Sequence, residues 1–364
     1  MKLFSRFILL AAAILLLACS PKPPKSPTLV NTIYMKQDTV VADLRLPLCP
    51  DAGPCRAADV SITSLGAAGF VIEVEGRSIM TAPSYTNPSI WRLPLGHIEA
   101  DTAWIDASFP AGITGVEAIL VGHAHYDHLM DVPHLMNNQL PDSVAYGSET
   151  MAAILEADGF TAELCSGGAA YARGAGVRAV ALNDCIEDPV PVSSKIRLYP
   201  LTGDHAPHFL GIQFFTGHYE LGELDRLPRT SWGWKTGKML AFLVDFLNDA
   251  GDKIIFRMYY QDAASKPGLA LVPDAILNQR QIDVAFINLS NFAATDDYPQ
   301  GIVRNTRAEL YVVSHGEDIF NDRGKPRRVV RNSDESEFFA RLLYAMPAGS
   351  QYIMPMPGTR IEIQ

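Results

Sequence analysis

The sequence lacks the features that mark several common classes of protein. It has no long run of basic residues, and a net charge of −10 gives it no field that would attract nucleic acid. It has no Cys-x-x-Cys pair of the kind used in cysteine-based zinc or redox sites, and no Gly-x-Ser-x-Gly motif that would indicate a serine nucleophile. We find no internal repeat. The composition, 48% hydrophobic and 19% charged over 364 residues, is that of an ordinary globular protein with one large domain or two small ones.

The N-terminus has the pattern of a targeting segment. Lys2 and Arg6 precede the apolar residues 7–17, a run that is too short to be a comfortable membrane span. Residues 16–19 read Leu-Leu-Ala-Cys and resemble the lipobox of bacterial lipoproteins, which implies cleavage before a lipid-modified Cys19. The alternative is an ordinary secretory signal with a chance cysteine.

The targeting pattern at the N-terminus divides the chain into three parts. We predict a signal peptide over residues 1–18, a tether and N-terminal extension over residues 19–58, and a single globular domain over residues 59–364. Ser20 after the cysteine favours sorting to the outer membrane of the bacterial envelope, with the domain facing the periplasm. The expected partners are therefore a membrane, through the lipid anchor, and a small-molecule or lipid substrate.

The remaining cysteines fit an exported protein. Four cysteines form up to two disulfides, and three pairings are possible. Local pairing joins Cys49 to Cys55 and Cys165 to Cys185, and the alternative is four buried free thiols.

Apolar segments along the domain alternate between strand-like and helix-like patterns. Alternation or short apolar runs predict strands over residues 60–65, 69–74, 78–81, 118–121, 195–199, 239–246, 253–260, 284–289 and 308–313. The spacing of apolar residues predicts helices over residues 130–140, 148–158 and 335–345, with a long polar insert around Cys165 and Cys185. Strands and helices alternate in both halves, so the predicted class is α/β or α+β with layered sheets.

Residues 123–128 read His-Ala-His-Tyr-Asp-His and directly follow an apolar strand. Imidazole and carboxylate are the ligands that zinc and similar divalent metals prefer. His123 and His125 alternate as strand residues do and are expected to share a face, while Asp127 and His128 turn toward a second position. The pattern predicts two metals, because a metal-free cluster would bury several polar rings that each need a partner.

Three further candidate ligands each follow a later apolar strand. They are His205, Asp262 and His315. Strand ends are rigid platforms, and their loops gather at one edge of a sheet, so the three can be brought to one point. His208 competes with His205 for the same position, and we prefer His205 because it comes sooner after the strand; His208 is then a possible substrate contact.

Other residues near these sites have simpler interpretations. His134 is expected to be structural on the helix after the motif, and His97 and His218 to lie on the surface or in loops. The apolar segment 209–215 is interpreted either as part of the core or as the wall of an acyl-chain channel.

The order His-x-His-x-Asp-His, then His, Asp and His, resembles that of the metallo-β-lactamase-fold hydrolases over residues 60–364. The resemblance implies an αββα sandwich, in which two mixed sheets flanked by helices hold two metals at one edge. Carried over residue by residue, it gives a first metal bound by His123, His125 and His205, a second bound by Asp127, His128 and His315, and Asp262 bridging both, opposite a bridging hydroxide.

Two positions depart from the pattern of that family. Asp262 is flanked by Gln261 and Ala263, where the family often has Gly-Asp-Thr or Gly-Asp-Ser, and Ala82-Pro83 stands where the family often has Asp-Pro. A carboxylate that supports the ligands is therefore expected to be missing, which would alter metal affinity.

The resemblance implies a metal-dependent hydrolase in which Asp127 also orients the hydroxide. Two Zn²⁺ ions are expected, with Mn²⁺ or Fe as alternatives. Residues 65–72 and 229–234 are similar to the branch that contains N-acyl-phosphatidylethanolamine phospholipase D and ascorbate-phosphate lactonase, so phosphodiesters, including phospholipid-like ones, are the leading substrate class. The alternatives are a lactonase or other ester or amide hydrolase and, in another class, a non-catalytic binding lipoprotein. Whether residues 129–204 form a lid stays open.

Overall fold

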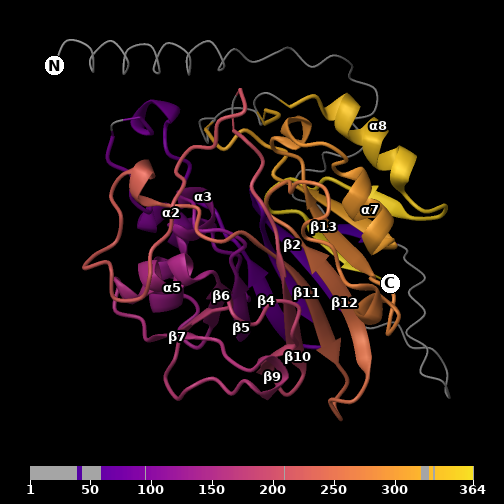
Figure 1. Cartoon of the computed structure of the whole chain (residues 1–364), viewed down its shortest axis with the longest axis horizontal. Coiled ribbons are helices and arrows are strands. Elements are labelled where there is room, and N and C mark those ends of the chain that lie inside the picture. Colours follow the sequence, from indigo (N-terminus) through magenta and orange to yellow (C-terminus); the bar gives the residue numbers. More distant parts are fainter. Residues whose placement is uncertain are drawn as a thin grey trace.

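Two mixed sheets pack face to face, and helices cover the outer face of each, as the layers in Figure 1 show. The structure is a computed structural model that describes residues 39–42, 59–94, 96–208, 210–320, 328–330 and 333–363. The predicted signal peptide, the lipidated Cys19 and the predicted pair of Cys49 and Cys55 lie outside these residues.

The first sheet has nine strands, and all of its long strands are rich in β-branched and aromatic residues. In sheet order the strands are β1 (Thr39–Ala42), β16 (Arg360–Ile363), β2 (Val60–Gly66), β3 (Gly69–Val74), β4 (Arg77–Thr81), β5 (Val116–Leu120), β6 (Val144–Gly147), β8 (Ala179–Ala181) and β7 (Ala162–Leu164). Strands β2, β3 and β4 form an antiparallel meander, while β4, β5, β6 and β8 run parallel.

The second sheet has seven strands. In sheet order they are β15 (Gln351–Ile353), β14 (Leu310–Ser314), β13 (Val284–Asn288), β12 (Ile254–Tyr260), β11 (Leu240–Leu247), β10 (Ile196–Thr202) and β9 (Val190–Ser193). Strands β10 and β12 are both antiparallel to β11, and β12, β13 and β14 are parallel. The carboxyl ends of β10, β12 and β14 therefore lie at the same edge of this sheet.

Helices form the two outer layers. Against the first sheet lie α2 (Thr102–Ser108), α3 (Tyr126–Leu129), α4 (Val132–Asn138) and α5 (Glu149–Glu156), and against the second α6 (Asp274–Leu277), α7 (Gln300–Thr306) and α8 (Glu335–Ala345). Short 3-10 turns are η2 (Ile90–Arg92), η3 (Gly168–Ala170), η4 (Ser231–Gly233) and η5 (Phe292–Ala294). Asp101, Ser148 and Asp334 begin α2, α5 and α8, and each side chain accepts a backbone N–H of the first turn.

Three hydrophobic cores separate the four layers. The central core lies between the sheets, where Phe70 of β3 meets Phe286 of β13 with ring centroids 4.8 Å apart. A second core lies between the first sheet and α2–α5, and a third between the second sheet and α6–α8. The predicted fold class, an αββα sandwich of two mixed sheets flanked by helices, is confirmed.

Two sequence-based expectations about the middle of the chain are settled by the structure. The disulfide between Cys165 and Cys185 is confirmed, and both cysteines are fully buried. The expected polar insert is wrong in part, because two of its short segments form β7 and β8 at the end of the first sheet. Strand β1, inside the predicted extension, was not predicted; it pairs in parallel with β16.

No helix among the described residues is long and apolar enough to span a membrane.

Candidate metal centre

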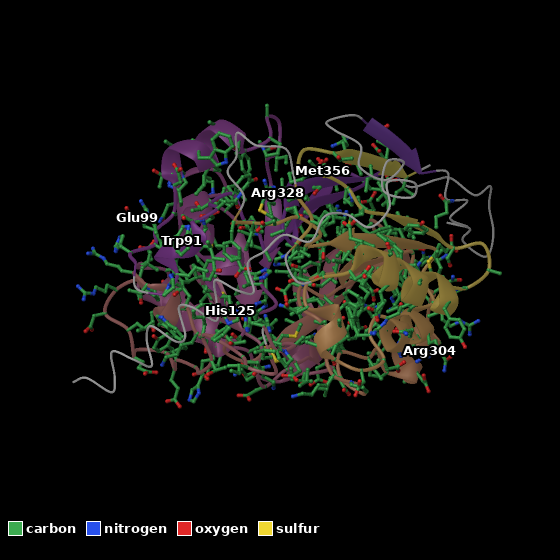
Figure 2. All side chains as sticks on the ribbon, turned by 90° about the horizontal axis from the view of Figure 1, so that it is seen from above. Trp91, Glu99, His125, Arg304, Arg328 and Met356 are labelled. Carbon is green, nitrogen blue, oxygen red and sulfur yellow. A yellow bond between two sulfur atoms is a disulfide. The ribbon has the colours of Figure 1, made fainter. Side chains whose placement is uncertain are left out.

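Four candidate ligands come from one short loop and the helix that follows it. Strand β5 ends at Leu120, and His123 and His125 lie in the loop before α3. His125 is the residue that begins α3, which places Asp127 and His128 in its single turn. The expected strand-like alternation of His123 and His125 is therefore wrong, since a loop rather than a strand presents them. In Figure 2, His125 lies where the purple and orange parts of the ribbon meet.

Three candidate ligands come from the second sheet. His205, Asp262 and His315 follow the carboxyl ends of β10, β12 and β14, as the sequence predicted. Because those ends share one edge of the sheet, the three side chains converge on the loop after β5. All three are buried.

The seven side chains form three adjoining groups in which the possible ligand atoms lie within 4.8 Å of one another. The groups are His123, His125 and His205; His123, His128 and Asp262; and Asp127, His128 and His315. The first and third match the two expected ligand sets. Asp262 shares its group with one histidine from each set, so it lies between the two positions.

Hydrogen bonds to the rings leave defined nitrogen atoms for a metal. His205 Nδ1 donates to the carbonyl of Ala206 at 2.6 Å, which leaves Nε2 unprotonated. His125 Nε2 lies 2.8 Å from Thr236 Oγ1, whose own proton goes to the carbonyl of Phe215 at 3.1 Å. The hydroxyl therefore accepts from His125 Nε2–H, and Nδ1 is the free nitrogen of that ring.

Several buried ring nitrogens have no hydrogen-bond partner. These atoms are His123 Nε2, His128 Nδ1 and His315 Nδ1. An unpaired buried polar atom is costly, and almost all such atoms in native proteins are paired. Unpaired imidazole nitrogens beside two carboxylates fit a bound divalent ion of the borderline type, such as zinc.

Burial favours the neutral form of three of the histidines, whereas at His315 the hydrogen bond and charge of Asp127 outweigh burial and raise the pKa of the ring. Burial lowers the pKa of His123 and His125 well below the usual range, and that of His205 to about 4. Burial alone would raise the pKa of Asp127, but His128 and His315 outweigh it and hold that pKa well below its usual value. Neutral imidazole and ionised carboxylate are the forms that bind metal.

Asp262 is held by groups from both sheets. The backbone N–H of Gly122 donates to its Oδ2 at 3.0 Å, and Asn288 Nδ2 donates to its carbonyl. A Cβ atom at Gly122 would lie 2.4 Å from the carboxylate oxygens of Asp262, so only glycine lets these two segments of the chain approach this closely. Gly122 was not predicted as a residue of the site, although a glycine directly before the first histidine was a visible signal.

The remaining histidines fall outside the three groups. The ring of His208 stacks on His205 with centroids 4.5 Å apart, and its Nδ1 accepts the backbone N–H of Phe214 at 3.1 Å. His134 lies on α4 and pairs with Asp106 at 2.7 Å, while the side chains of His97 and His218 are exposed.

The segment that borders the centre is not the one considered as a lid. Residues 129–202 mostly form the helices and strands of the layers. The loop between β10 and β11, residues 203–239, instead carries His205, His208 and Thr236 past the centre.

No protein family model matches the chain, and no curated protein sequence matches it. Solved structures similar to it include the metallo hydrolase Igni18 from Ignicoccus hospitalis, with 16% identity over 84% of this chain and 98% of that one, at a TM-score of 0.49. The metallo-β-lactamase fold protein YhfI from Bacillus subtilis has 12% identity over 84% and 99%, at 0.45. An isothiocyanate hydrolase from Delia radicum gut bacteria has 13% identity over 82% and 98%, at 0.46. With these identities and with TM-scores below 0.5, none of the similarities decides what this chain binds or cleaves.

Proposed function

We propose that the chain is a metal-dependent hydrolase that holds two divalent ions at the edge of its two sheets. The observation that carries the proposal is the set of three adjoining ligand groups that share His123 and His128, together with their unpaired buried nitrogens. One ion would be held by His123, His125 and His205 and the other by Asp127, His128 and His315, with Asp262 between them. Zn²⁺ suits this mixture of imidazole and carboxylate, and Mn²⁺ or Fe are the alternatives.

When bound, two such ions acidify a water molecule and polarise the bond that it attacks. The protein's own residues fix the geometry. Thr236 and the carbonyl of Ala206 set the ring orientations of His125 and His205, and Gly122 fixes Asp262. Asp127, held as an anion, accepts a hydrogen bond from the attacking water and so orients it.

Two cysteines are excluded as nucleophiles, because Cys165 and Cys185 are joined in a disulfide. The proposed reaction is attack by water, which the two ions would activate.

Phosphodiesters are the proposed substrate class. Two ions held by the three ligand groups would supply positive charge to both sides of a displacement at phosphorus. Lactones and other esters or amides are the second candidate, because the same centre polarises a carbonyl.

We also propose that the chain is tethered at the bacterial outer membrane through Cys19. The support is the leader-like pattern of residues 2–19 alone. In cells, Cys19→Ser is expected to move the protein from the membrane fraction to the soluble fraction, and an unchanged distribution contradicts the anchor.

Metal content and a substrate panel test the function. Elemental analysis of the purified full chain is expected to give about two metals per chain. Bis-p-nitrophenyl phosphate is expected to be cleaved faster than lactones or carboxylic esters, and Asp127→Ala is expected to abolish cleavage while His134→Gln keeps it. If no metal is tightly bound after zinc addition, or if no member of the panel is hydrolysed, the hypothesis of a non-catalytic binding protein is favoured.

A further inference from the structure

Several exposed apolar side chains gather on the loop that carries two of the site's histidines. Among the described residues, the large hydrophobic side chains with high exposure include Leu210, at 77%, and Ile212 and Trp232, each at 54%. All three lie between β10 and β11, on the same loop as His205 and His208. The interpretation of residues 209–215 as a buried strand or loop packed on the core is met only in part, since Leu210 and Ile212 are exposed whereas Phe215 is partly buried and packs against the core of the first sheet.

A row of aromatic rings connects the candidate metal centre to the surface. The ring of Phe215 lies 5.8 Å from the ring of His125, and Trp232 lies 5.0 Å from Phe215. On the side of His208, Phe214 lies 5.6 Å from the imidazole and 6.4 Å from Trp232. Both lines of contact start at a histidine of the centre or beside it and end at the half-exposed Trp232. We call Phe214, Phe215 and Trp232 the aromatic row.

The outer end of the aromatic row is fixed to a neighbouring loop. Trp232 Nε1 donates to the carbonyl of Pro94 at 3.1 Å, and Ser231 Oγ donates to the carbonyl of Leu93 at 2.6 Å. The indole is thus anchored through its polar atom while its apolar body stays open, as expected for a contact surface. In Figure 2 Trp91, on η2 of that neighbouring loop, lies farther out toward the edge of the molecule than His125.

We infer that the aromatic row binds an apolar alkyl or acyl group of the substrate, whose scissile polar group lies at the metal centre. The inference rests on the proposed function and names a feature of its substrate, an amphiphile. Continuity carries it: ring contacts run from His125 and His208 through Phe214 and Phe215 to the half-exposed Trp232, so the row joins the candidate centre to the surface. Each methylene that the row removes from water is expected to tighten binding by about twofold to fourfold.

Alkyl phosphonates of increasing length test the aromatic row without any cleavage. Butyl, hexyl, octyl and decyl phosphonate are titrated by calorimetry into the zinc-loaded full chain, below their micelle concentrations. Affinity is expected to rise with each methylene in the natural protein. In Trp232→Ala the rise is expected to flatten, while Trp232→Phe, which keeps an aromatic ring but not the bond to Pro94, is expected to retain it.

Trp104→Ala is the matched control, because Trp104 is an exposed tryptophan on α2 and is not a member of the aromatic row. An affinity that does not depend on chain length, or a dependence that Trp232→Ala leaves intact, overturns the inference. A third outcome is that Trp232→Ala weakens binding to phosphatidylglycerol vesicles while the affinity for monomeric phosphonates does not depend on chain length. The aromatic row is then a membrane contact and the inference is wrong.

The two proposals fail in different ways. If short phosphodiesters are cleaved and chain length has no effect on binding, the role of the aromatic row is rejected and the proposed hydrolase activity stands. If phosphonate binding depends on chain length but no substrate is hydrolysed, the role of the row stands and the hydrolase activity is rejected.

Discussion

Strand β12 connects two buried polar clusters that differ in whether their atoms are paired. In its middle, Arg257 lies directly opposite Asp245 of β11 and is fully buried. Its guanidinium binds both carboxylate oxygens of Asp245 and the carbonyls of Ile276 and Arg280. Just beyond the end of the same strand, Asp262 belongs to the candidate metal centre, where ring nitrogens remain unpaired.

The contrast separates a structural cluster from a binding one. The cluster around Arg257 satisfies its charges with groups of the fold itself: Asp245 also accepts from Arg197, and Asp283 accepts the backbone N–H of Arg257 at 2.7 Å. In the candidate centre, by contrast, three buried ring nitrogens have no hydrogen-bond partner: His123 Nε2, His128 Nδ1 and His315 Nδ1. A closed cluster contributes to the stability of this fold, whereas an open one is completed by a ligand.

The largest expected effect is the loss of a partner from the closed cluster. Arg257→Met leaves the buried Asp245 with only Arg197, and breaking a buried ion pair in this way costs about 3–5 kcal/mol of unfolding free energy. Urea unfolding measures it. Arg360→Met is the control, because its pair with Glu73 is partly exposed and is expected to contribute less than about 1 kcal/mol. Equal losses in the two variants would erase the distinction between the clusters.

The next effect concerns the open cluster. Adding zinc to the metal-free full chain, at a free concentration of about 100 times the dissociation constant, is expected to raise the unfolding free energy by about 2.7 kcal/mol for each ion bound. The ions bind the assembled groups of the folded state, and the unfolded chain has no preformed site. Arg257→Met is expected to keep this increment, because the two clusters share no partner, and Asp127→Ala to lose the share of the ion that Asp127 would hold. No shift of the unfolding midpoint with zinc contradicts an open cluster.

A smaller effect is expected from Thr236, which touches the centre only through His125. Thr236→Val removes the oxygen that accepts from His125 Nε2–H, so the ring loses the contact that directs Nδ1 inward. Changes to such supporting groups lower metal affinity by about 10-fold to 100-fold. Competition with a chromophoric chelator measures it. Thr236→Ser keeps the hydroxyl and is expected to retain the affinity of the natural protein; a loss as large as that of the valine variant shows that packing rather than the hydrogen bond matters.

The sequence allowed the ligands of the open cluster to be predicted because they follow local rules. Residues 123–128 concentrate imidazoles and a carboxylate directly after an apolar strand, and His205, Asp262 and His315 each follow another such strand. The alternation of strands and helices predicted layered sheets, and the αββα order of the layers was implied by the resemblance to the metallo-β-lactamase-fold hydrolases. The positions of the strand ends alone are enough to predict that the side chains of His205, Asp262 and His315 meet at one edge of the sheet.

The supporting contacts depend on tertiary register and gave no such signal. Thr236 is 111 residues from His125 in the chain, and it reaches that ring only because the loop before β11 turns back past the centre. Asp245 faces Arg257 because β11 and β12 pair in one particular register, which an alternating apolar pattern does not specify. Strand β1 was missed for the same reason, since its partner β16 lies at the other end of the chain.

The smallest effect is expected at a histidine that is already paired at the surface. His134 on α4 contacts Asp106 at 2.7 Å, and Asp106 is half-exposed and also accepts from Gln139 at 2.9 Å. His134→Gln is expected to change the unfolding free energy by no more than about 0.5 kcal/mol and to leave the metal content unchanged, because the pair faces solvent and no ligand group includes it. Elemental analysis beside urea unfolding checks both quantities on one preparation. A loss of metal in this variant would show that α4 also affects the metal affinity of the centre. The unpaired nitrogens of the open cluster would then not be sufficient to explain metal binding.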